Sequence, residues 1–255
     1  MVNEAIYLVV MSKMLFIIVL TIVTSYMDLR KREIPLKVWA LSLPLAIFLT
    51  IIEYTNSYYV DTRSIYIYII GLFFSIGLSV LFYLFDFFGG ADMFAFITLS
   101  IIFPINFVKE YIIPPQLLLI LYASVTGLFF SLVYFLFNII NRNWRKLPRN
   151  IGLMRKIMLM FLGVPVKSKN YIKMKFYYPL TVYNCEKEPE IRYSFSIEEE
   201  YEDSIKYIKE LIEKKCISGE TYLWVTYGIP FLINIYVGFI LTLLVKDSWL
   251  VHLIK

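Results

Sequence analysis

The chain has 255 residues, of which 59% are hydrophobic and only 18% are charged, and its mean hydropathy is +0.68. Soluble domains contain about 45–50% apolar and about 25% charged residues, so this composition excludes an ordinary soluble domain and indicates a membrane protein. The net charge of +5 is unevenly distributed along the chain. The two cysteines and one histidine form no cluster with zinc spacing, so we expect no bound metal. We also expect no cofactor and no nucleic-acid partner.

Six apolar runs approach the roughly 20 residues that a transmembrane helix needs. In chain order they are 14–27 (extendable back to Ile6), 38–52, 64–85, 93–108, 117–140 and 222–245. The second and fourth runs are short, so tilting or shelter by neighbouring helices has to compensate for their length. We therefore predict an all-α polytopic membrane protein. Five transmembrane helices are expected in residues 1–140, and a sixth transmembrane helix followed by an external tail is expected in residues 222–255.

Lys13 interrupts the backward extension of the first run. A lysine inside a span is costly unless it lies at the outer rim of the membrane. If translation starts at Met11 or Met14 rather than at Met1, Lys13 becomes an external flank or is lost, and the sequence leaves these three starts open. The first run is not followed by a small-residue cleavage site, which argues against a signal peptide.

Basic residues alternate between the connections that join these runs. The first connection holds Arg30, Lys31, Arg32 and Lys37, and the segment after the fifth run opens with Arg142, Arg145, Lys146, Arg149, Arg155 and Lys156. The second and fourth connections hold only Arg63 and Lys109. The positive-inside rule therefore places the first, third and fifth connections in the cytosol and both termini outside a cell membrane.

The fifth connection, residues 141–221, is long enough for a small cytosolic α+β domain inserted between the fifth and sixth helices. Its first part, through residue 163, mixes basic with large apolar residues, which is typical of an amphipathic segment on an anionic lipid leaflet. Segments 173–182 and 190–196 have strand composition.

A helix is predicted after the second of these segments. Ser196 is its expected N-cap, and the apolar residues that follow, up to Ile212, keep helical spacing. Cys185 and Cys216 also lie in this insert. Geometry allows them to pair, but a cytosolic location predicts that both are free thiols.

Two aspartates lie near the ends of apolar runs. Asp28 follows the first run in the segment DLRKREIP (residues 28–35), and Asp92 opens the fourth in GGAD (residues 89–92). Taken alone, the first is explained by a charged stop after a span and the second by a helix cap in a tight turn. Asp86, one turn before the glycines, is a third candidate on chemistry alone.

The predicted topology places Asp28 and Asp92 on the same face of the membrane. A carboxylate at that depth costs free energy, because the low dielectric disfavours its charge. Two of them on one face suggest a dyad that shares a proton, in which one carboxylate deprotonates a water while the other polarises the scissile carbonyl.

Both segments resemble the motifs of a known family. Asp-Leu-Arg-x-x-x-Ile-Pro after the first span is similar to the first-aspartate motif of type IV prepilin peptidases, and Gly89-Gly90-Ala91-Asp92 resembles the archaeal form, Gly-x-hydrophobic-Asp, of the second motif. The six spans, the late insert and the motif Trp-Val-x-x-x-Gly-Ile-Pro-Phe (residues 224–225 and 228–231) also resemble the archaeal preflagellin (archaellin) peptidases, which belong to the GxGD-type intramembrane aspartic proteases.

The resemblance implies that Asp28 and Asp92 are the catalytic pair, that Gly89 and Gly90 permit the turn that delivers Asp92, and that Asp86 is not catalytic. It implies as substrates precursor proteins with a short basic leader followed by a hydrophobic helix, cut at the cytosolic membrane face. The Cys-x-x-Cys pairs of the bacterial enzymes are absent, which argues against their zinc and against their N-methyltransferase activity.

Helix position predicts how the pair divides its roles. Asp28 ends a helix and Asp92 begins one, and a helix dipole favours negative charge at its start. We therefore expect Asp92 to act as the base while Asp28 holds the proton. The acidic run at residues 198–203 is able to attract a basic leader, although a solvated, dipole-matched helix start explains it more simply.

Two other functions remain open at this stage. The same carboxylates suit an H⁺- or Na⁺-coupled transporter, although such folds usually show internal repeats and broken midplane helices. A scaffold whose insert binds a partner is the other alternative. The sequence determines neither the oligomeric state nor whether the precursor is an archaellin or another pilin-like protein.

Overall fold

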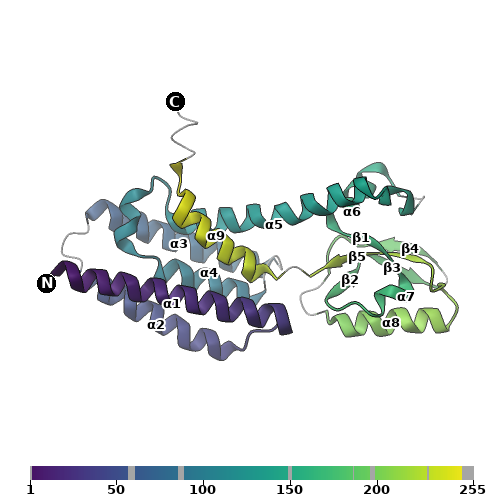
Figure 1. Cartoon of the computed structure of the whole chain (residues 1–255), viewed down its shortest axis with the longest axis horizontal. Coiled ribbons are helices and arrows are strands. Elements are labelled where there is room, and N and C mark those ends of the chain that lie inside the picture. The colour runs from purple at the N-terminus through teal and green to yellow at the C-terminus, as the bar shows by residue number, and fades with distance from the viewer. Residues whose placement is uncertain are drawn as a thin grey trace. The chain divides into compact units, whose positions relative to one another are not determined.

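A computed structural model of the chain divides into two compact units (Figure 1). The first comprises residues Met1–Gly127 and Pro230–Lys255, and the second comprises Leu128–Ile229. The residues that the structure describes are 2–56, 61–85, 89–148, 151–185, 187–195, 199–228 and 230–248.

Helices make up the first unit. They are α1 (Val2–Lys31), α2 (Leu36–Asn56), α3 (Thr62–Leu84), α4 (Gly90–Ile102), the short 3-10 helix η1 (Ile105–Glu110), the first half of α5 (Pro115–Ile140) and α9 (Phe231–Val245). Among the described residues, four helices are long and apolar enough to cross a membrane, namely α1, α2, α3 and α5. The fourth and sixth predicted spans contain the shorter apolar helices α4 and α9, so six full-length spans are not confirmed.

The fourth predicted span, residues 93–108, ends early as a helix. Phe103 adopts extended backbone angles (φ −54°, ψ 130°) directly before Pro104, whose ring disfavours the helical conformation in the preceding residue. The chain then continues as η1. The prediction of a helix over the whole run is therefore wrong, and α4 is only 13 residues long.

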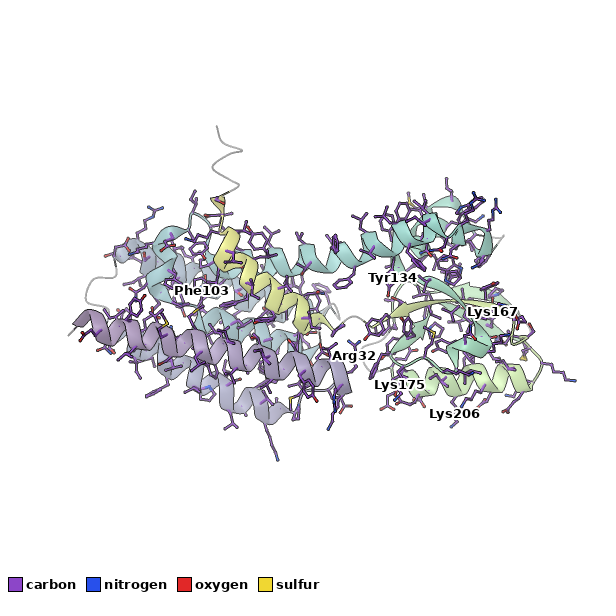
Figure 2. The ribbon with its side chains drawn as sticks, viewed as in Figure 1. Arg32, Phe103, Tyr134, Lys167, Lys175 and Lys206 are labelled. Atoms are coloured by element: carbon purple, nitrogen blue, oxygen red, sulfur yellow. A yellow bond between two sulfur atoms is a disulfide. The ribbon has the colours of Figure 1, made fainter. Side chains whose placement is uncertain are left out.

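The core of the first unit forms around α4, which contacts α1, α2, α3 and α9. Its buried side chains include Phe96 and Leu99, and just past its end Phe103 is buried between the rings of Tyr111 and Phe239, at centroid distances of 5.9 and 6.2 Å (Figure 2). Because α4 is enclosed by its neighbours, a helix too short to face lipid along a full span still has an apolar environment.

Lys13 is fully buried in this unit, where it forms an ion pair with the fully buried Glu53 of α2. Glu53 also accepts hydrogen bonds from the backbone N–H (3.2 Å) and the side-chain amide (3.0 Å) of Asn106 in η1. From sequence, a lysine in a span is expected to lie at the outer rim of the membrane. The structure offers a different solution, a buried partner of opposite charge from a neighbouring helix.

The second unit contains the end of α5 together with small helices and two sheets. Its elements are the 3-10 helix η2 (Asn143–Lys146), α6 (Leu153–Leu162), β1 (Val164–Lys167), α7 (Ser168–Tyr171), β2 (Tyr177–Pro179), β3 (Thr181–Asn184), β4 (Lys187–Ile191), α8 (Tyr201–Glu213) and β5 (Tyr222–Tyr227). The first sheet is antiparallel in the order β1-β5-β2, with Val164 opposite Val225 and Tyr177 opposite Tyr227. Strands β3 and β4 form a two-stranded sheet.

The prediction that the sixth span begins at residue 222 is wrong. Residues Tyr222–Tyr227 form β5, the central strand of the first sheet, and α9 begins only at Phe231. The strand is apolar on both faces, since it contains the fully buried residues Leu223, Trp224 and Val225. Its sequence therefore resembles the start of a transmembrane helix. The insert therefore extends beyond residue 221.

The predicted strands and helix of the insert are found with shifted boundaries. Segment 173–182 contains β2 and the start of β3, while the strand predicted at 190–196 is β4, which ends at Ile191. Ser196 lies outside the described residues, and α8 begins at Tyr201 with Glu200 as its N-cap. Its buried Ile208 keeps the predicted inward face.

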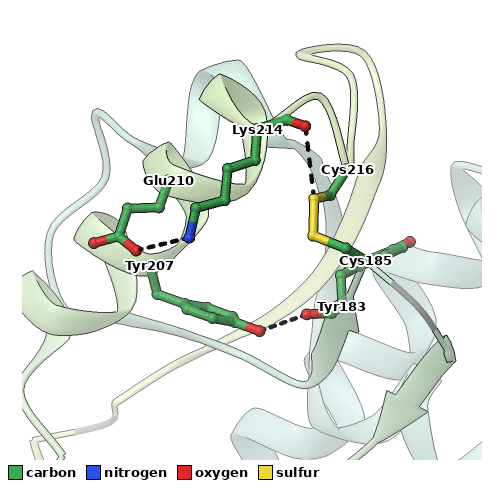
Figure 3. The surroundings of a disulfide bond; sticks show 6 residues. All are labelled: Tyr183, Cys185, Tyr207, Glu210, Lys214 and Cys216. Atoms are coloured by element: carbon green, nitrogen blue, oxygen red, sulfur yellow. Dashed lines mark hydrogen bonds and ion pairs between the residues drawn. A yellow bond between two sulfur atoms is a disulfide. The ribbon is translucent and has the colours of Figure 1, made fainter.

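Cys185 and Cys216 form a disulfide with a Cα–Cα distance of 4.9 Å (Figure 3). The bond joins the turn after β3 to the segment that follows α8, and the Tyr207 hydroxyl donates a hydrogen bond of 2.5 Å to the Tyr183 carbonyl beside it. The expectation of free thiols, which rested on the predicted cytosolic location, is therefore wrong for this structure. Tertiary folding brings the two cysteines together across 31 positions of sequence.

Candidate active site

Asp28 lies in the last turn of α1. The helix ends where Arg32 adopts a left-handed conformation (φ 58°) and its N–H donates a 3.2 Å hydrogen bond to the Asp28 carbonyl. This is a helix C-cap of the left-handed type, and Pro35 then prevents the helix from continuing. The end of α1 thus fixes Asp28 one turn before a sharp change in chain direction at Arg32, which is labelled in Figure 2.

Asp92 lies in the first turn of α4. Gly89 is the N-cap, and its backbone N–H donates a 3.1 Å hydrogen bond to Oδ2 of Asp92. An acidic side chain three residues after the N-cap that accepts from the N-cap amide is one half of a capping box. Asp92 is thereby oriented by its own helix start, and its side chain is only partly exposed.

The structure brings the two aspartates into one site. Helices α1 and α4 are in contact, and the Asp28 and Asp92 carboxyl groups are close enough for their charges to act on one another. Asp86, the third candidate from sequence, lies outside the described residues.

A third element, the start of α9, completes this site. The backbone N–H of Leu232 lies near the Asp28 carboxyl, and the charge of Arg32 acts on the same carboxyl. Phe231 packs its ring against Phe96 of α4 at a centroid distance of 6.3 Å. Sequence reasoning missed the Leu232 amide, and the available signal was Pro230, which sets the start of a helix at this point.

These contacts bear on the predicted division of roles. Arg32 and the start of α9 also lie beside Asp28, so the dipoles of α1 and α4 are not the only electrostatic influences on the pair. The assignment of Asp92 as base and Asp28 as proton holder stays a prediction.

Ser25 was not identified from the sequence. Its Oγ is buried and has no hydrogen-bond partner among the described residues. Thr21 and Thr24 in the same helix instead donate to the carbonyls of Ile17 (2.6 Å) and Leu20 (2.8 Å), as hydroxyls in apolar helices usually do. Ser25 precedes Asp28 by three positions, so both side chains lie on the same face of α1.

Trp39 is a second buried side chain with unused hydrogen-bonding capacity. Its ring, in the first turn of α2, stacks on the ring of Phe94 with centroids 6.3 Å apart and an interplanar angle of 20°. Phe94 lies in α4, two residues after Asp92. Its indole N–H has no acceptor within the part of the chain that the structure describes. Apolar packing from α2 therefore supports the helix turn that carries Asp92.

The backbone at the two glycines before Asp92 is unstrained. Gly89 has extended backbone angles (φ −70°, ψ 159°) that other residues also adopt, and no described glycine has a positive φ. A Cβ built on Gly90 would meet the Tyr83 ring only at 3.8 Å, which is ordinary contact. Neither strain nor space in this structure requires a glycine at position 90.

The acidic run of the insert lies within the second unit. Glu199 binds the Arg192 guanidinium through two hydrogen bonds (2.6 and 2.7 Å) and accepts a third from Ser204 (2.6 Å). Glu202 and Asp203 are exposed in the first turn of α8, and Glu198 lies outside the described residues. At least one acid of the run thus has an internal partner, which favours the simpler explanation of a helix start.

Comparison with known proteins gives two family matches. The model described as "Type IV leader peptidase family" matches residues 14–132, a stretch that contains both Asp28 and Asp92. The model described as "Archaeal Peptidase A24 C-terminus Type II" matches residues 155–248, which include β1 to β5, α8 and α9. No curated protein matches the chain. The two matched stretches take up most of its length.

Proposed function

Because this chain belongs to the type IV leader peptidase family, we propose that it is a membrane-embedded aspartic endopeptidase whose catalytic groups are Asp28 and Asp92. Membership makes the chain a prepilin or preflagellin peptidase in general and implies precursor proteins as substrates. The observation that carries the finer proposal is the contact between α1, whose last turn bears Asp28, and α4, whose first turn bears Asp92.

The proposed reaction is hydrolysis by a dyad that shares one proton. The ionised carboxylate removes a proton from a water, whose oxygen attacks the scissile carbonyl carbon, while the protonated partner donates to the carbonyl oxygen. When the tetrahedral intermediate collapses, the protonated carboxyl donates its proton to the leaving nitrogen. The other carboxylate takes the proton of a hydroxyl on the intermediate, so the pair regains its single shared proton. Arg32 and the Leu232 amide beside Asp28 support the negative charge that the pair retains.

The proposed substrate has a short basic leader followed by a hydrophobic helix. Such a helix enters the bilayer and leaves the leader junction at the membrane surface. This is the depth expected for residues in the last turn of α1 and the first turn of α4. The basic residues of the first connection, around Arg30 and Lys31, support a cytosolic location for this site. We propose that the leader is removed at that face.

The test is cleavage of a type IV pilin-like precursor co-expressed with the full chain. Asp28→Asn and Asp92→Asn should each reduce leader removal to background, because a neutral amide neither accepts the proton from water nor shares one with its partner. Asp86→Asn is the matched control and should retain cleavage.

Cleavage that survives both substitutions would refute the dyad. The transporter alternative makes a different prediction, in which proteoliposomes that contain the chain show an H⁺ or Na⁺ flux that Asp28→Asn or Asp92→Asn abolishes. Loss of cleavage without any such flux in the unchanged chain supports the peptidase.

A further inference from the structure

Helix α6 is fixed to the end of α5 on its inner face. Leu159 and Met160 are buried in a cluster with Leu147, Leu180 and Trp224. The Phe161 ring stacks on Phe135 of α5, with centroids 4.1 Å apart and an interplanar angle of 5°. Both contacts lie within the second unit, so they are independent of how the two units are arranged.

A buried asparagine ties the end of α6 to the last turns of α5. The side-chain amide of Asn138 donates to the carbonyls of Met160 (2.9 Å) and Gly163 (2.7 Å), and its Oδ1 accepts from the amide of Asn143 (2.9 Å). Asn138 is two positions before the end of α5, which is one of the four candidate spans. The end of α6 is therefore held at the depth where α5 leaves the apolar part of the membrane.

The outer face of α6 is apolar and exposed. Leu153 is 75%, Met154 71%, Met158 42% and Ile157 37% exposed. Positions 153, 154, 157 and 158 follow helical spacing and form one continuous face. We call these four side chains the α6 surface. A contiguous exposed apolar patch of this kind indicates a binding surface.

The charges in the sequence segment that contains the α6 surface have a single sign. Residues 141–163 include six basic residues and no acidic residue. Arg155 is exposed within α6, and in η2 the guanidinium of Arg145 lies 5.1 Å from the ring centre of Trp144, which is itself exposed. Basic residues beside large apolar side chains, with an exposed tryptophan, are typical of a segment at the interface of an anionic membrane.

We propose that the α6 surface binds the membrane that α5 crosses, with its apolar side chains among the acyl chains and the neighbouring arginines and lysines on anionic phospholipid headgroups. The occupant is lipid because Asn138 holds α6 at the depth of the bilayer surface and because basic charge without acidic charge complements an anionic leaflet. The second unit is thereby held on the membrane surface. This inference goes beyond the proposed peptidase function and does not depend on what Asp28 and Asp92 do.

The first test measures the depth of α6 in the full chain. A fluorophore sensitive to polarity is attached at Met154→Cys, and the protein is placed in nanodiscs whose lipids carry a spin-label quencher on the acyl chain. Lys209→Cys, on the exposed face of α8, is the control position. We expect blue-shifted, quenched emission at position 154 and neither effect at position 209.

Two results of that measurement overturn the proposal. Quenching at position 154 that does not exceed quenching at 209 means that α6 stays in water. A blue-shifted label that the lipid quencher does not reach means that protein, rather than lipid, covers the α6 surface. Circular dichroism and size-exclusion profiles that match those of the unchanged chain establish that the labelled variants are folded.

The second test addresses the anionic lipid. Nanodiscs of phosphatidylcholine are compared with nanodiscs that also contain phosphatidylglycerol, which should increase the quenching at position 154. Arg155→Gln with Lys156→Gln should remove that increase. Lys206→Gln with Lys209→Gln makes the same charge change on α8 and should leave it intact (Lys206 is labelled in Figure 2). An increase that survives the α6 double substitution overturns the role assigned to the basic residues.

Discussion

The ammonium group of Lys13 in α1 and the carboxylate of Glu53 in α2 form an ion pair whose two side chains are fully buried. Asn106 of η1 satisfies the second oxygen of Glu53 through two hydrogen bonds. This cluster joins three elements of the first unit. It therefore locks the position of α1 relative to α2 and to the segment that follows α4.

Breaking this pair should strongly destabilise the bundle. Glu53→Leu leaves the Lys13 charge buried without its partner, and removing one member of a buried pair costs about 3–5 kcal/mol. We expect a large fall in the melting temperature in detergent. The double variant Lys13→Met with Glu53→Leu should recover much of the loss, because no charge is then left buried. If the two single losses simply add in the double variant, the two residues are not coupled.

Ser25→Ala should lower the rate of leader cleavage more than its effect on stability explains. The Ser25 hydroxyl is buried, is unpartnered among the described residues and shares a helix face with Asp28. If this hydroxyl donates to the Asp28 carboxylate during the reaction, the hydrogen bond lost contributes about 1.5–3 kcal/mol, so we expect a loss of roughly tenfold or more in kcat together with a shifted pH profile. Ser25→Thr should restore most of the rate.

Thr24→Val is the matched control for this experiment. It removes a neighbouring buried hydroxyl that already donates to its own helix, at Leu20. Its kcat and pH profile should stay close to those of the unchanged chain. Equal effects of Ser25→Ala and Thr24→Val on the pH profile would contradict a specific role for Ser25.

Arg32→Gly should separate the conformation of position 32 from its charge. A non-glycine residue in the left-handed region costs about 1 kcal/mol, so glycine should leave the melting temperature no lower than that of the unchanged chain. Cleavage should nevertheless fall, because the positive charge that acts on Asp28 is lost. Arg32→Lys retains a charge and should keep more activity than Arg32→Gly. Full activity of the glycine variant would show that this charge is dispensable.

Gly90→Ala should be tolerated. The backbone of Gly90 is helical with a negative φ, and an added Cβ finds only the Tyr83 ring at 3.8 Å, so both folding and precursor cleavage should stay near normal. Gly238→Ala in α9 is the contrasting variant. There the Cβ would lie 2.6 Å from the backbone nitrogen of Ala123, and we expect a clear loss of stability. Inactivity of a well-folded Gly90→Ala variant would support the stricter requirement that the resemblance implies.

Much of the first unit could be predicted from sequence, because an apolar run that crosses a membrane has to satisfy its backbone hydrogen bonds within its own helix. The apolar runs that contain α1, α2, α3 and α5 are each long enough to indicate a span without any tertiary information. The positions of Asp28 at a helix end and of Asp92 at a helix start follow from those runs and from the glycines before Asp92. Ser25 and Arg32 were less predictable, since their relevance depends on side-chain direction and on a backbone angle.

The sequence by itself determined the membrane class, the helices of the bundle and the two aspartates that end or begin them, because hydrophobicity and helix capping act over a few neighbouring residues. Only the tertiary structure decided that residues 222–227 pair with β1 and β2 as a strand, that Lys13 finds Glu53, and that Cys185 reaches Cys216. It alone brought the Leu232 amide to Asp28. Each of these contacts joins residues far apart in the chain, so its free energy depends on packing that no local pattern encodes.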